Sequence, residues 1–161
     1  MDSAITFKEL LQYTAIESRR WQQWFLAHPR ALDLTCDVAK AGTVRGLVLH
    51  IFATELFFAH AVLGLPEPDW KSLPSKTVGE LFSVGADARK KFQEFLDKAE
   101  PRHWKERKTL HDGTIKASKR KMVAQALLHG IHHRAQLATF LRQRGFKGMW
   151  VHDLILTDVM T

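Results

Sequence analysis

The stretch 127-LLHGIHHRAQL-137 places three histidines within five positions of a segment whose apolar residues recur with helical spacing. On a helix, each residue advances about 100° around the axis. His129 and His133 are four positions apart, so both point toward the apolar stripe, whereas His132 falls on the polar side. The stretch therefore predicts a core helix that presents two imidazoles on its buried side.

Three further segments have helical character. The expected bounds of the four helices are Thr6 to His28, Thr43 to Leu63, Thr77 to Glu100, and Ser118 to Arg144 with Gly145 just beyond the end. Thr6 and Thr77 are each followed three residues later by glutamate, the pattern of a capping box. Helices of this length are roughly 30 Å long, and four of them make a four-helix bundle. We expect one all-α domain over residues 1–161, which agrees with the chain length.

The connections between these segments add two expectations. Asp112-Gly113 is a two-residue turn signal between short extended runs, so a small β-hairpin is expected before the fourth helix. The connection 65–76 contains three prolines. It can span roughly 40 Å when extended, so the second and third helices need not be antiparallel neighbours. The apolar tail 150–160 is expected to add a turn or two of helix.

The composition, 45% hydrophobic and 25% charged residues, is that of a soluble globular protein. Cys36 is the only cysteine, which excludes an internal disulfide and a cysteine-based metal cluster and favours a reducing, cytoplasmic setting. The N-terminus lacks the pattern of a secretory signal. The most apolar run, 47–63, carries His50, Glu55 and His60, which are costly in hydrocarbon. We interpret it as a buried helix and expect no membrane partner.

The net charge of +7 is concentrated in one segment. Between Arg102 and Lys121 there are eight Lys or Arg and two acidic residues, a net charge of +6 that leaves about +1 for the rest of the chain. A solvated basic edge is the favoured interpretation. Attraction of an anionic substrate comes next. A nucleic-acid contact, which Trp104 within the segment would suit, is the least favoured.

Two imidazoles do not complete a tetrahedral metal site, so His129 and His133 need a third ligand from elsewhere. His50 shares one side of the second helix with small and apolar residues, and a buried histidine there needs a partner for its ring nitrogens. The pair on the fourth helix lacks a third ligand and His50 lacks a partner for its ring nitrogens, so a shared metal would satisfy both. Taken separately, His50 is more typical of a hydrogen-bonded core residue than of a metal ligand, and the pair on the fourth helix is more typical of histidines without a ligand role. Five further histidines look like surface or boundary residues and receive no role: His28, His60, His103, His111 and His152.

Two stretches resemble the DinB (DNA-damage-inducible) family of small bacterial four-helix proteins. The stretch 126-ALLHGIHHRAQLATFLRQRGF-146 is similar to the family signature H-x-x-H-H-R-[GA]-Q-[IL], with Ala135 where glycine is common. The stretch 47-LVLHIFATELFFAHAVLG-64 resembles the family's second-helix pattern of histidine, glutamate and a bulky aromatic, here His50, Glu55 and Phe58. The resemblance covers essentially the whole chain.

The resemblance implies a bundle of up-down-down-up order and a divalent-metal site. One histidine comes from the second helix and two, four apart, from the fourth, which in this chain are His50, His129 and His133. Nickel and zinc are the metals implied, and family members are often homodimers. His132 is expected outside the site and Gln136 beside it. Arg134 is expected to face a neighbouring helix or a dimer surface, because a metal dication repels a guanidinium.

Three imidazoles leave at least one open coordination position, the layout of a catalytic site. This permits hydrolysis by an activated water. It also permits transfer or isomerisation with a low-molecular-weight thiol, as in the DinB-like thiol transferases and isomerases that the family resembles. The expected substrate is a small molecule, with an anionic one as one option. Glu55 lies about 140° around the helix from His50, so we expect it to bond a neighbouring helix or hairpin. The alternatives of another class are a non-enzymatic dimeric bundle and a weak nucleic-acid-binding protein acting through residues 102–121.

Overall fold

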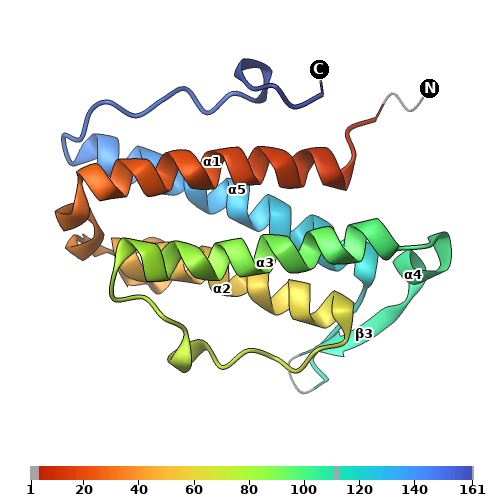
Figure 1. Ribbon diagram of the computed structural model, residues 1–161. Coiled ribbons are helices and arrows are strands. Elements are labelled where there is room, and N and C mark those ends of the chain that lie inside the picture. Colours follow the sequence, from red (N-terminus) through yellow and green to blue (C-terminus); the bar gives the residue numbers. More distant parts are fainter. Residues whose placement is uncertain (1–3, 111–112, 161) are drawn as a thin grey trace.

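Four long helices pack side by side in the computed structural model, which describes residues 4–110 and 113–160 (Figure 1). They are α1 (Phe7–Ala27), α2 (Val44–Leu63), α3 (Val78–Lys98) and α5 (Lys119–Gln143). α1 and α5 run in one direction and α2 and α3 in the other, because the long connection after α2 returns along the bundle before α3 begins (Figure 1). The predicted four-helix bundle and its up-down-down-up order are confirmed.

Capping residues set the ends of these helices close to the predicted positions. Thr6 and Thr77 both form complete capping boxes with the glutamate three residues later. The hydroxyl of Ser118 accepts a hydrogen bond from a backbone N–H in the first turn of α5. Gly64 ends α2 with φ of +75° and Gly145 follows α5 with φ of +86°, a left-handed conformation that glycine adopts without steric cost.

The predicted hairpin lies directly before α5. Its strands, β3 (Arg107–Leu110) and β4 (Ile115–Ser118), pair antiparallel. Asp112 of the predicted turn, and His111, lie outside the described residues. The predicted helix in the apolar tail is a single 3-10 turn, η4 (Leu154–Leu156).

Several short elements were not predicted. The third helix ends at Lys98, earlier than expected, and α4 (Pro101–Lys105) follows it, beginning at a proline that suits a first helical position. The remaining elements lie in the two connections that flank α2: η1 (Pro29–Asp33), β1 (Thr35–Cys36), η2 (Val38–Lys40), β2 (Gly42–Thr43) and η3 (Trp70–Ser72). β1 and β2 pair antiparallel.

Two apolar clusters fill the interior, one toward each end of the bundle. Trp21, Leu47 and Leu137 belong to one cluster, and Leu11 and Met122 to the other. The buried polar side chains come from intermediate positions on the same helices: Thr14, Glu17, Ser18, Thr54, Glu55 and Arg134. The middle of the bundle is therefore a polar layer between two apolar ones.

α2 is long and apolar enough to cross a membrane by length and composition alone. Most of its apolar stretch is buried against the other elements, and α2 packs against both α3 and α5. This packing agrees with its interpretation as the central core helix.

Candidate metal centre

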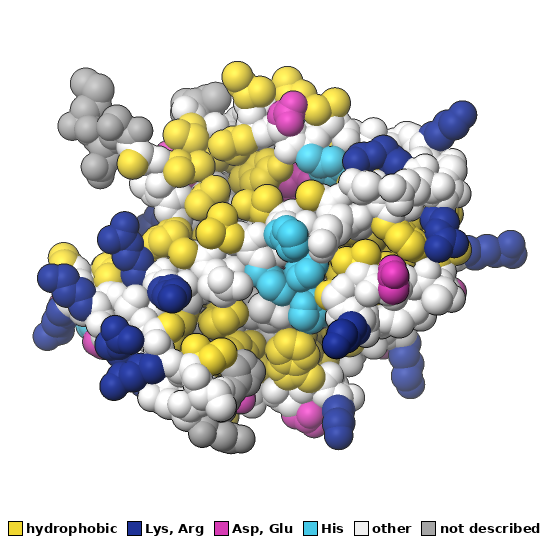
Figure 2. All heavy atoms as spheres, turned by 180° about the vertical axis from the view of Figure 1, so that it is seen from behind, with side chains coloured by type: hydrophobic (Ala, Val, Ile, Leu, Met, Phe, Trp, Pro, Cys, Tyr) yellow, Lys and Arg dark blue, Asp and Glu magenta, His cyan; other side chains and the backbone are white. Residues whose placement is uncertain are grey.

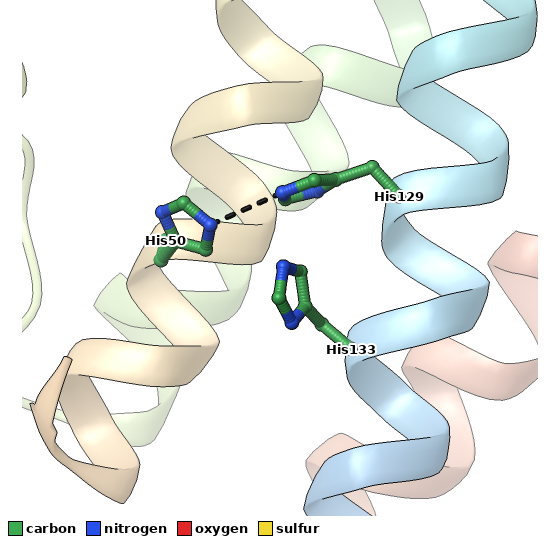
Figure 3. A group of neighbouring side chains, drawn as sticks. All are labelled: His50, His129 and His133. Carbon is green, nitrogen blue, oxygen red and sulfur yellow. Dashed lines mark hydrogen bonds between the residues drawn. The ribbon is translucent and has the colours of Figure 1, made fainter. Parts of the chain in front are cut away.

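Three histidines from two antiparallel helices meet in the polar layer (Figure 3). His50 comes from α2, and His129 and His133 lie one turn apart on α5. One nitrogen from each ring lies within 4.8 Å of the other two, and the Nε2 atoms of His50 and His129 are 3.1 Å apart. Metal–nitrogen bonds of about 2.0–2.1 Å in tetrahedral geometry place ligand nitrogens roughly 3.3 Å apart. The spacing and the donor set both fit a divalent metal.

Gln136 orients the third ring. Its Oε1 accepts a hydrogen bond of 2.6 Å from Nδ1 of His133. An amide oxygen can only accept, so the proton of this ring lies on Nδ1 and its Nε2 carries the lone pair that a metal requires. The predicted position of Gln136 beside the three histidines is confirmed. Nδ1 of His129 is buried and has no hydrogen-bond partner within residues 4–110 and 113–160.

One side of the three-histidine group faces solvent. Figure 2 shows histidine side chains gathered in the middle of one face of the molecule, with apolar side chains close by. His132 is exposed and does not belong to the group whose nitrogens converge, as the helical angles predicted. Trp70 of η3 lies next to His50, with 6.3 Å between the ring centroids, and is itself 40% exposed.

Burial favours the neutral form of all three rings. It lowers the pKa values of His50 and His133, and in His129 burial together with the nearby His133 and His50 lowers the pKa to about 4. The hydrogen bond to Gln136 opposes this effect in His133 without reversing it. Neutral imidazole is the form that binds metal, so these rings suit metal binding at neutral pH.

Glu55 and Arg134 form a buried ion pair and do not join the histidines. Arg134 Nη2 donates to Glu55 Oε1 at 2.8 Å and to Ser18 Oγ at 3.4 Å, which ties α5 to both α2 and α1. Gly130 makes this contact possible, because a Cβ there would lie 2.5 Å from Arg134 Nη1 and 2.7 Å from Glu55 Oε1. The expectation that both residues contact neighbouring helices is confirmed.

The family model of the DinB family matches residues 1–158, nearly the whole chain. The chain belongs to the DinB family. No curated protein matches it. The resemblance seen in the two histidine-containing stretches is thus confirmed, and this DinB chain carries a three-histidine cluster that can hold a metal.

A second polar group of this DinB protein was missed by the sequence reasoning. The carboxylate of Glu17, 3% exposed, accepts hydrogen bonds from Trp150 Nε1 at 2.8 Å and from His152 Nδ1. The sequence alone assigns His152 no role. A signal was present in α1, where Glu17 falls on the buried side between Thr14 and Trp21. A carboxylate at such a position requires partners.

Proposed function

We propose that this DinB protein is a divalent-metal-dependent enzyme that activates a low-molecular-weight thiol for transfer to, or isomerisation of, a small-molecule substrate. His50, His129 and His133 would hold the metal, nickel or zinc. The observation that carries the proposal is the convergence of three imidazole nitrogens within 4.8 Å, with no carboxylate in that group among the described residues. When bound, such a metal would act as a Lewis acid at an open coordination position.

The surroundings of the histidines favour a thiol over a water as the activated molecule. Metal-dependent hydrolysis commonly uses a nearby carboxylate as general base. Glu55, the acidic residue next along the family pattern, is instead paired with Arg134. A thiol needs no such base, because a coordinating thiol is deprotonated outright. Hydrolysis remains the second candidate.

The residues around the metal ligands have separate tasks in this proposal. Gln136 holds His133 in the tautomer that presents Nε2. Trp70, beside His50 and partly exposed, offers an apolar surface to the body of a substrate. The buried pair of Glu55 and Arg134 keeps α2 and α5 in register, so that His50 stays opposite the two histidines of α5.

Metal analysis of protein purified without a histidine tag tests the metal centre. His50→Ala, His129→Ala and His133→Ala are each expected to lose most of the bound metal. His132→Ala is the same substitution at the exposed histidine directly before His133, and this variant is expected to retain the metal. Wild-type protein that carries no metal, and binds none when given zinc or nickel, would contradict the proposal.

Cobalt substitution then separates the two chemistries. Adding 2-mercaptoethanol or N-acetylcysteine to the cobalt protein is expected to produce a sulfur-to-cobalt charge-transfer band, and His50→Ala is expected to abolish it. Turnover of simple esters without any thiol, together with the absence of that band, would favour the hydrolase instead.

A further inference from the structure

A pocket of about 290 Å³ lies between α1, α5 and the C-terminal segment. Its α5 wall includes Ile131, Ala135 and Ala138. These positions lie about 120–180° around the helix axis from His129 and His133. The pocket is therefore on the other side of α5 from the candidate metal centre, and its volume is at the lower end of the range for small-molecule sites.

Three buried polar atoms without partners among the described residues belong to side chains that line this pocket: Oγ1 of Thr14, Nε2 of His152 and Nη1 of Arg134. Thr14 is 1% exposed, and its Oγ1 has no hydrogen-bond partner among the described residues. The same holds for Nε2 of His152, whose other ring nitrogen is held by Glu17. Buried polar groups without partners are uncommon in native proteins. All three atoms indicate a polar ligand group at this place.

The position of the His152 ring is fixed by Glu17. Burial alone would raise the pKa of Glu17, but hydrogen bonds from His152 and Trp150 outweigh burial and lower it. Glu17 is therefore an anion that accepts from Nδ1 of His152. The ring is left with Nε2 as the nitrogen available to a ligand.

The charges around the pocket favour an anionic ligand. Arg134 is paired with Glu55, and Glu17 has Arg20 within 3.4 Å. Arg142 lines the pocket and is exposed; its guanidinium donates to the hydroxyl of Thr139. Within the part of the chain that the structure describes, no carboxylate pairs with Arg142. One positive charge thus stands next to a largely apolar wall.

We propose that this pocket binds a small monocarboxylate with an apolar body, at a site separate from the metal centre. The Arg142 guanidinium and the Thr14 hydroxyl donate to the ligand carboxylate. With a proton on both ring nitrogens, His152 bridges the two carboxylates, donating from Nδ1 to Glu17 and from Nε2 to the ligand. The apolar body packs on Ile131, Ala135 and Ala138.

Benzoate serves as the probe, with benzamide as its uncharged analogue of the same shape. Titration of the isotope-labelled full chain, followed by amide NMR shifts, is expected to show saturable binding of benzoate. The shifts should gather in 13–17, 131–142 and 150–153. Benzamide is expected to bind at least about tenfold more weakly, because a charged hydrogen-bond partner is lost.

Variants of two neighbouring arginines test the assignment. Arg142→Gln is expected to weaken benzoate binding about tenfold or more, whereas Arg144→Gln, an equal loss of charge two residues further on and outside the pocket, should leave it unchanged. Thr14→Val, which keeps the shape of a buried side chain, should also weaken binding. His50→Ala should leave benzoate affinity unchanged, so that the pocket is tested independently of the metal centre.

Four outcomes would overturn the proposal. They are an absence of saturable binding, equal affinity for benzoate and benzamide, equal effects of Arg142→Gln and Arg144→Gln, and shifts centred on His50, His129 and His133.

Discussion

The side-chain amide of Gln136 determines which nitrogen of His133 faces the other two histidines. Gln136→Leu removes the acceptor, and the ring is then free to rotate and to change tautomer. Loss of such a partner typically costs about 10- to 100-fold in metal affinity, so we expect a decrease of that size in zinc competition titrations. Gln125→Leu, the same change at an exposed position of α5, is the matched control and should bind metal like wild type.

The lowered pKa of His129 makes the stability of the metal-free protein depend on pH. The ordinary pKa of histidine is 6.5, and the folded environment lowers that of His129 to about 4. As the pH falls from about 6.5 toward 4, the His129 ring becomes protonated in the unfolded chain but stays neutral in the folded chain. The stability contributed by the neutral ring is present above this window and is lost as the pH falls through it.

Urea unfolding of metal-free protein at about pH 7 and about pH 5 measures this loss. Wild type and His132→Gln should lose more stability between the two conditions than His129→Gln, which has no titrating ring at that position. Equal losses in all three proteins would show that His129 does not titrate as described.

Between elements, the buried pair of Glu55 and Arg134 joins α2 to α5. Arg134→Leu leaves the Glu55 carboxylate buried without its partner, which typically costs about 3–5 kcal/mol. Replacing both residues with leucine removes the charge together with its partner, so the double variant should regain most of the lost stability. Urea unfolding of the single and double variants decides the matter. A double variant as unstable as Arg134→Leu would contradict the explanation.

The elements also show which features were predictable from the sequence. The capping boxes at Thr6 and Thr77 predicted the starts of two helices correctly, because a cap depends only on residues within one helical turn. Helical periodicity likewise separated His129 and His133 from His132, and Gln136 was found by the same angles.

Contacts of irregular segments could not be found in this way. The pair of Glu17 and His152 joins α1 to a segment 135 residues later that has no periodicity, so no helical angle indicates where the ring points. The pairing of β1 with β2 could not be predicted either, since two residues per strand are too few to show an alternating pattern.

The expected homodimer and the expected cytoplasmic setting stay predictions.

At the scale of the whole molecule, the candidate metal centre joins two helices whose ligands lie 79 positions apart in the chain. A metal that binds the folded chain but not the unfolded chain stabilises the fold by about 2.7 kcal/mol when its free concentration is 100 times Kd. For a protein of this size each kcal/mol raises Tm by about 2–4 °C. Adding zinc to protein whose metal has been removed with a chelator should therefore raise Tm by roughly 5–10 °C.

The matched variants make this thermal shift specific to the three histidines. His132→Ala should show the full increase in Tm, because its exposed ring stands outside the converging nitrogens. His50→Ala should show little or none, because it removes the only one of the three nitrogens that comes from α2 and so cuts the connection between the helices. An undiminished increase in His50→Ala would mean that zinc binds elsewhere and that α2 takes no part in holding it.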